Sequence, residues 1–313
     1  MRGRDPHQLT EAALAGDRGA LARALSLVEQ GGSAAAQVDA RVHRLRSRAA
    51  TVGVTGAPGA GKSTLTDRLI SEARRGGATV AVLAVDPSSP RSGGAILGDR
   101  VRMDDHFRDP GVYIRSMATR GALGGLAVAV PGAVRLLGAV GFDWILVETV
   151  GVGQVEVDIA GAADTTIVVV NPGWGDAVQA SKAGLIEIAD VLVVNKADRP
   201  GAAETEADLL AMLAVRGAAS DGWDVPVVRT SGTDGTGVTA LWRAVADHGD
   251  ILRTTGGLAR RRAQRTRDEL RARVLLLVSR RAEQRCTGEE FERISRAVAS
   301  GSLDQHAAAQ LLV

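Results

Sequence analysis

Residues 56–63 read Gly-Ala-Pro-Gly-Ala-Gly-Lys-Ser, and this run constrains the fold more than any other part of the chain. It follows an apolar segment, 50–55, that is typical of a buried strand, and it leads into a segment, 63–72, with the periodicity of a helix. In that context the pattern predicts a loop whose backbone N–H groups surround phosphate oxygens, with Lys62 and the helix N-terminus adding positive charge. The hydroxyl of Ser63 suits Mg²⁺. The alternative is a glycine-rich turn with a solvated lysine. The residues expected to hold a nucleoside triphosphate are Gly56, Ala57, Pro58, Gly59, Ala60, Gly61, Lys62, Ser63 and Thr64.

Short apolar runs alternate with helical segments through the middle of the chain. Most of the runs are continuously apolar, as in strands that helices cover on both faces. This alternation predicts an α/β fold with a doubly wound, mainly parallel sheet. The expected strands are 50–55, 79–85, 112–114, 144–147, 165–170, 191–194 and 225–228.

Helical segments are expected on both sides of this region. Apolar residues recur at helical spacing over 9–29, and a second, basic helix is expected at 35–47. The arginine-rich segment from Ile251 onward has no strand pattern but carries an apolar stripe, and it either folds back on the core or packs against a second subunit. We therefore expect a helical N-terminal extension (1–49), a nucleotide-binding domain (50–250) and a helical C-terminal arm (251–313). The stripe consists of Leu270, Val274, Leu277 and Val278.

The composition argues against several classes of partner. Lys and Arg exceed Asp and Glu by only 38 − 36 = 2, and aromatic residues make up 3% of the 313 residues. This excess of charge is too small for a general hold on nucleic acid or on an anionic membrane, although local patches stay possible. The few aromatic rings further weaken a nucleic-acid interpretation. A single cysteine, Cys286, rules out an internal disulfide and a thiolate cluster, and residues 1–10 lack the apolar core of a secretory signal. We expect a cytoplasmic protein with no nucleic-acid or membrane partner.

Residues 195–198 read Asn-Lys-Ala-Asp and directly follow an expected strand. The carboxylate of Asp198 can accept hydrogen bonds from N1–H and the amino group of guanine, whereas adenine presents an unprotonated ring nitrogen. Lys196 would lie along the base plane, and the backbone at Ser231 and Gly232 suits a contact with the base oxygen. The alternative is an ordinary strand exit. Combined with the phosphate loop, this tetrapeptide predicts GTP and GDP as ligands.

Two carboxylates stand where expected strands end, at the edge where ligands bind in such folds. Asp86 ends one strand, and Glu148 begins the run Glu-Thr-Val-Gly, where small GTPases of the Ras type have an aspartate. We expect Asp86 to hold a Mg²⁺-bound water beside the direct ligand Ser63. The N–H of Gly151 is expected to contact the γ-phosphate. The alternative for each carboxylate is a helix cap.

The segments 88–103 and 171–182 combine glycine or proline with charged residues, and they are candidate switches. Asp99 is expected to contact Mg²⁺-bound water or to orient the attacking water. Lys182 is expected to steady charge in the transition state. The alternative for both residues is an ordinary surface charge.

Several phrases of the sequence, in this order, resemble the MeaB/ArgK family of P-loop GTPases, which belongs with the metal-chaperone and signal-recognition branch. The resemblance covers nearly the whole chain. The phrases are residues 56–63, 85–90, 93–103, 116–121, 123–125, 148–154 and 195–198.

The resemblance implies a homodimeric GTPase that chaperones an adenosylcobalamin-dependent acyl-CoA mutase, usually methylmalonyl-CoA mutase, by gating cofactor delivery and protecting the enzyme. It implies that Asn195 and Asp198 read the base, that Gln179 and Lys182 lie in a third switch, and that the C-terminal helices form the dimer arm. The catalytic residues would be Lys62, Asp99, Glu148 and Lys182, and the Mg²⁺ site would comprise Ser63, Asp86, Asp99 and Glu148.

Other readings stay open at this point. The chain departs from many relatives at Val155, and the motifs do not separate methylmalonyl-CoA mutase from the isobutyryl-CoA or ethylmalonyl-CoA enzymes. A metallochaperone for another metalloenzyme would need clustered Cys or His, but the five histidines are scattered. A small-molecule kinase linked to amino-acid transport would need an acceptor site, for which the sequence offers no pattern.

Overall fold

The computed structural model divides into two compact units, Met1–Arg265 and Thr266–Val313. The first unit contains the sheet and the helices around it. The residues described are 5–45, 47–86, 106, 108–118, 125–149, 161–174, 179–216 and 222–312, with the backbone alone at 86, 118, 125–128, 179–183 and 216.

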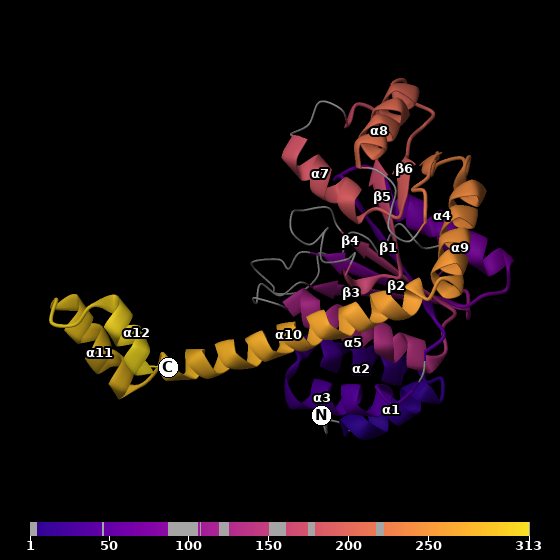
Figure 1. Cartoon of the computed structure of the whole chain (residues 1–313). Coiled ribbons are helices and arrows are strands. Elements are labelled where there is room, and N and C mark those ends of the chain that lie inside the picture. Colours follow the sequence, from indigo (N-terminus) through magenta and orange to yellow (C-terminus); the bar gives the residue numbers. More distant parts are fainter. Residues whose placement is uncertain are drawn as a thin grey trace. The chain divides into compact units, whose positions relative to one another are not determined.

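A seven-stranded sheet runs through the first unit in the order β3-β2-β4-β1-β5-β6-β7 (Figure 1). Every pair of neighbouring strands is parallel, which confirms the predicted doubly wound sheet. The third strand continues four residues beyond the expected 112–114, because it pairs with β2 along its whole length. The strands are β1 (Ala50–Gly56), β2 (Val80–Asp86), β3 (Val112–Ala118), β4 (Trp144–Thr149), β5 (Thr165–Val170), β6 (Val191–Val194) and β7 (Val227–Arg229).

Helices cover both faces of the sheet, and side chains along each strand alternate between them. In β2, Val80 and Val82 pack with α4 and α9 on one face, whereas Leu83 and Val85 pack with α2 and α5 on the other. Both faces are therefore apolar, as the continuous runs predicted. The helices are α1 (Pro6–Leu14), α2 (Arg18–Gln30), α3 (Gly32–Val42), α4 (Lys62–Arg75), α5 (Gly125–Val140), α7 (Gln179–Ile188), α8 (Ala202–Arg216), α9 (Val238–Thr254), α10 (Gly257–Arg285), α11 (Glu289–Ala299) and α12 (Gln305–Leu312).

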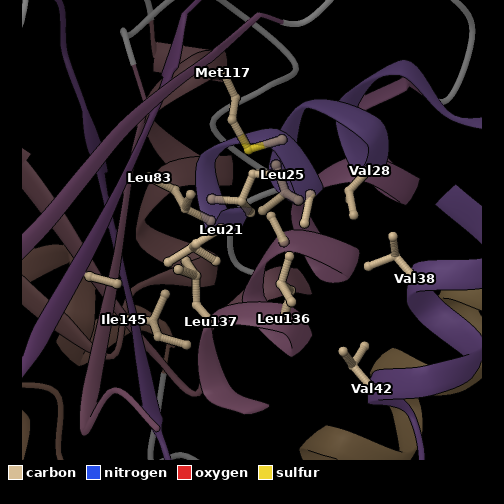
Figure 2. Packing of buried hydrophobic residues seen from close by; sticks show 14 of the residues in the cluster. Leu21, Leu25, Val28, Val38, Val42, Leu83, Met117, Leu136, Leu137 and Ile145 are labelled. Carbon is tan, nitrogen blue, oxygen red and sulfur yellow. The ribbon is translucent and has the colours of Figure 1, made fainter. Parts of the chain in front are cut away.

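The N-terminal helices pack into the core of the first unit. Figure 2 shows Leu21 and Leu25 of α2 among Leu136 and Leu137 of α5 and Ile145 of β4. All five side chains are buried. Because burial of each such side chain contributes roughly 1.5–3 kcal/mol, these helices stabilise the sheet that carries the site.

The expected single helix over 9–29 is wrong, since the chain breaks between α1 and α2. Gly16 has φ +96°, a left-handed conformation that glycine adopts without strain. Asp17 then caps α2 by accepting a hydrogen bond from the N–H of Ala20 at 2.9 Å. The helix expected at 35–47 exists but is shifted toward the N-terminus, since α3 begins at Gly32 and ends at Val42.

The helix α10 is 29 residues long and exposes apolar side chains in the second unit. Leu277 is 57% exposed, and Leu270, Val274 and Val278 are also exposed at spacings that place them on one side of the helix. Despite this apolar stripe, none of the described helices is both long enough and apolar enough to cross a lipid bilayer.

The first turns of α10 are attached to the sheet by ion pairs within the first unit. Asp164, just before β5, accepts hydrogen bonds from Arg262 at 2.7 Å and from Arg265 at 3.1 Å. Its carboxylate also accepts from the N–H of Thr51 in β1 at 3.1 Å. Burial alone would raise the pKa of Asp164, but the hydrogen bond from Arg262, the charges of both arginines and the Thr51 N–H hold that pKa below its ordinary value.

We predict that Asp164→Asn lowers the free energy of unfolding at pH 7 by about 2–3 kcal/mol. The substitution removes the buried negative charge that pairs with Arg262 and Arg265, and the loss is moderate because both arginines are partly exposed to solvent. The depressed pKa means that the ionised carboxylate stabilises the fold above its unfolded-state pKa of about 3.9. That stabilisation is lost as the pH falls through the lower folded-state value. Urea unfolding should therefore show a gap between wild type and variant that is full at pH 7 and closes in acid. The exposed Asp247→Asn should leave stability unchanged, and an equally small effect of Asp164→Asn would contradict the assignment.

Candidate functional site

The loop between β1 and α4 has the backbone that a phosphate cradle requires. Gly59 and Gly61 have φ of 72° and 90°, both in the left-handed region. A Cβ on Gly56 would lie 2.0 Å from the carbonyl oxygen of Val169 in β5, and one on Gly61 would lie 2.5 Å from Nδ2 of Asn195. The glycines at positions 56 and 61 are therefore required both by space and by conformation.

Lys62 begins α4 and is only 7% exposed. Its ammonium group donates hydrogen bonds to the carbonyl oxygens of Gly56 at 2.8 Å and Ala57 at 3.0 Å. The side chain thus lies along the loop, and its positive charge is held where phosphate oxygens of a nucleotide would enter.

The second residue of α4 contacts the end of β4. Ser63 Oγ donates a 2.6 Å hydrogen bond to Oε1 of Glu148, a carboxylate that is 2% exposed. The two residues come together because β1 and β4 are neighbours, with Val54 in register with Glu148. A hydroxyl and a buried carboxylate beside a phosphate loop form an oxygen donor set that suits Mg²⁺. Among the described residues, no group of three His, Cys, Asp or Glu side chains could hold a metal ion.

The other sequence-predicted acidic and switch residues are less fully defined. Asp86 ends β2 at the same sheet edge as Glu148, since Val85 is in register with Thr149, but its side chain is not described. Asp99 and Gly151 lie outside the described residues, as does the whole segment 88–103. Gln179 and Lys182 lie on α7, of which the backbone alone is described there.

Asn195 connects three loops of the site. Its Nδ2 donates to the carbonyl oxygen of Ala60 at 2.7 Å, and its Oδ1 accepts from Thr230 Oγ1 at 3.0 Å and from the N–H of Gly232 at 3.1 Å. The residue is 2% exposed, so these bonds replace contact with water. Asn195 therefore fixes the loops after β6 and β7 against the phosphate loop.

Lys196 strengthens the same connection. It has φ 59°, the one left-handed conformation among the described residues that are not glycine. Its ammonium group donates a 2.7 Å hydrogen bond to the carbonyl oxygen of Gly59. This contact offsets part of the roughly 1–2 kcal/mol that a left-handed residue costs. It also joins the loop after β6 to the phosphate loop between β1 and α4.

The remaining base-site residues differ in how accessible they are. The side chain of Asp198 is exposed, whereas Ser231 is buried. The N–H of Ser231 donates to the carbonyl oxygen of Thr236 at 2.9 Å, and the N–H of Gly232 is used by Asn195. In this structure the N–H groups of Ser231 and Gly232 therefore both bond within the protein, and the loop lies against Asn195.

The sequence analysis missed Arg68 and the role of Thr230. Arg68 on α4 donates hydrogen bonds to the carbonyl oxygens of Gly232 at 2.9 Å and Thr233 at 2.7 Å. These bonds attach the loop after β7 to α4. Thr230 is fully buried and holds Asn195. No local pattern could reveal Arg68, because it lies 164 residues from Gly232.

Together these loops lie at the carboxyl ends of β1, β4, β6 and β7, and β5 lies between β1 and β6. The strand β1 is central, with β4 on one side and β5 on the other, and β6 follows β5 (Figure 1). In open parallel sheets ligands bind at such an edge, where connections diverge to opposite faces. The phosphate loop, the Ser63–Glu148 pair and the Asn195 network thus lie together at this edge of the sheet.

Comparisons with known proteins agree with this arrangement. The sequence model of the family described as methylmalonyl Co-A mutase-associated GTPase MeaB matches residues 21–287. A protein of Pyrococcus horikoshii described as a candidate GTPase is 48% identical over 98% of this chain and 96% of its own. The mitochondrial methylmalonic aciduria type A homolog of Mus musculus is 38% identical over 67% of this chain and 52% of its own. The crystal structure of a LAO/AO transport system kinase superposes with a TM-score of 0.73 at 25% identity, covering 100% of this chain and 97% of that one. The chain therefore belongs to the MeaB family of GTPases.

Proposed function

We propose that this GTPase is a chaperone of an adenosylcobalamin-dependent acyl-CoA mutase, with methylmalonyl-CoA mutase as the first candidate. The observation that carries the proposal is the match of residues 21–287 to a family described as associated with that mutase. The relative named for methylmalonic aciduria supports the same partner. In this proposal GTP binding and hydrolysis gate delivery of the cofactor and protect the mutase. The protein acts in the cytoplasm, where its exposed Cys286 stays reduced.

The proposed hydrolysis depends on positioning. Lys62 and the N–H groups of the loop hold the β and γ phosphates, and a water attacks in line. Ser63, Asp86, Asp99 and Glu148 would hold Mg²⁺, which when bound neutralises charge on the phosphate oxygens. The N–H of Gly151 contacts the γ-phosphate and reports its presence.

Two further roles complete the proposed site. Lys182 steadies the charge that develops on the leaving phosphates. Asp198 accepts hydrogen bonds from guanine while Lys196 lies along the base. The sequence after Glu148 offers no clear counterpart of the water-positioning glutamine of Ras, unless Gln154 takes that place. We therefore expect slow intrinsic turnover that suits a switch awaiting its partner.

The direct test of the partner is a GTPase assay with the acyl-CoA mutases of the source organism. We expect one of them to bind the GTPase and to raise its turnover by roughly tenfold, a coupling typical of regulated sites. Lys62→Ala should abolish the stimulated turnover. If none of these mutases binds and none stimulates, the chaperone proposal is refuted, while the GTPase itself stands.

We further propose that the protein is a homodimer formed through α10. The exposed stripe of Leu270, Val274, Leu277 and Val278 supports this. Apolar side chains on one side of a helix gain free energy when a second helix packs over them and removes them from water. Light scattering of the wild type should give twice the 32.4 kDa chain mass. Leu277→Asp should shift the mass to that of a monomer, whereas Ser279→Asp, which adds the same charge on the opposite side of the same helix, should not. A monomeric wild type would contradict the proposal.

A further inference from the structure

A cavity of about 380 Å³ lies at the amino-terminal edge of the sheet, on the opposite edge from the phosphate loop. Ala50, Trp144 and Thr165 line it, and they are the first residues of β1, β4 and β5. The candidate nucleotide site lies at the other end of these strands. The helix α9 and the start of α10 close the other sides, and every lining residue belongs to the first unit. None of the residues of the candidate nucleotide site lines this cavity.

One part of the cavity wall is apolar and rigid. Val52, Val245 and Leu252 line it, and each of them is 1% exposed. The indole of Trp144 is another part of this wall, and it packs on Trp242 with 4.5 Å between ring centroids. Such a surface suits an aliphatic or aromatic group, and its packed side chains lose little conformational freedom when that group binds.

The polar part of the lining is positive. It contains three arginines, Arg48, Arg253 and Arg262, and one carboxylate, Asp164. The carboxylate is already bonded by Arg262, by Arg265 and by the N–H of Thr51, so its charge is offset within the protein. Arg253 pairs with Asp250 on the outer surface of α9, yet its side chain remains 55% exposed. Because Arg262 and Asp164 offset each other, Arg48 and Arg253 are the arginines of the lining that can face a bound anion.

We propose that this cavity binds a small organic anion with an apolar body, such as a medium-chain carboxylate. The apolar group packs against Trp144, Val245 and Leu252, and the anionic group faces Arg48 and Arg253. The volume lies near the small end of the range for ligand sites, which excludes a second nucleotide and suits a single short chain. This site is separate from GTP binding and from the proposed chaperone role.

The structure offers a variant that fills the cavity without disturbing the fold. Gly249 lies inside α9 and lines the cavity. A Cβ there meets only the guanidinium of Arg253, at 3.5 Å, which is ordinary contact. Since glycine is unfavourable within a helix, Gly249→Leu should fold at least as well as wild type while its side chain occupies the cavity. Ala240→Leu adds the same side chain to an exposed position of α9 and serves as the control.

The experiment uses the full-length protein and anilinonaphthalene sulfonate as the fluorescent anionic probe, displaced by octanoate or by octan-1-ol. We expect saturable binding at one site that octanoate reverses and that an excess of GTP does not. Gly249→Leu should abolish this binding and Ala240→Leu should retain it. The double variant Arg48→Gln/Arg253→Gln should lower the affinity for octanoate about tenfold or more, since it removes charge-assisted contacts. The affinity for octan-1-ol should stay unchanged. Unaltered probe binding in Gly249→Leu, or displacement of the probe by GTP, would overturn the proposal.

Discussion

Lys62→Ala is expected to lower kcat/KM for GTP about 100-fold or more, because the variant loses the buried ammonium group of the phosphate loop. Preorganised donors of this kind are worth about 10²–10³ in rate when removed singly, and the group here is held by two carbonyl oxygens of the loop. The Gly56 carbonyl is buried and the Ala57 carbonyl is partly buried, so any loss of stability must be measured separately as a change in melting temperature. Steady-state GTP hydrolysis and titration with a fluorescent GTP analogue measure both effects.

The control for this variant is Arg75→Ala, which removes a positive charge from the exposed end of the same helix. It should leave hydrolysis within twofold of wild type. If Lys62→Ala kept normal activity with an unchanged melting temperature, the loop between β1 and α4 would not be the phosphate site.

Asp198→Asn is expected to lower the affinity for GTP roughly 100-fold or more and to raise that for xanthosine triphosphate. The physical reason is that an amide cannot accept hydrogen bonds from both N1–H and the amino group of guanine, and it leaves polar groups of the base unpaired. Xanthine offers a carbonyl oxygen where guanine has the amino group, so the amide N–H₂ finds a partner. Competition binding with GTP, XTP and ATP measures the change in preference.

Because Asp198 is exposed and forms no part of the Asn195 network, the substitution should not alter stability. Asp208→Asn, on the exposed side of α8, provides a matched control that should keep the wild-type nucleotide profile. An unchanged profile in Asp198→Asn would remove the base-reading role from this residue.

Much of the fold could be predicted because local patterns determine it. The apolar runs at 165–170 and 191–194 became β5 and β6 without change, since buried parallel strands must be apolar on both faces. The break at Gly16 was missed, because the apolar spacing continues across it while the backbone conformation does not. The packing of α2 and α3 against α5 also escaped prediction, since it joins residues about 100 positions apart.

The site shows the same division between local and distant information. Residues 56–63 and 195–198 were found from their own motifs, and the structure places them against each other through Asn195 and Lys196. The pairing of Ser63 with Glu148 depends on β1 and β4 being neighbours, which no motif states. Arg68 could not be found at all, because an arginine on a helix has no pattern that marks it as support for a loop of the base site.

The central claim is that the edge formed by β1, β4, β5 and β6 binds Mg²⁺-GTP, and isothermal titration calorimetry of the folded wild-type protein tests it most directly. We predict one GTP per chain with micromolar or tighter affinity in the presence of Mg²⁺, and binding of ATP at least about 100-fold weaker, as expected for a base site that pairs its carboxylate with guanine alone. Absence of any heat of binding with GTP, or equal binding of GTP and ATP, would contradict the account.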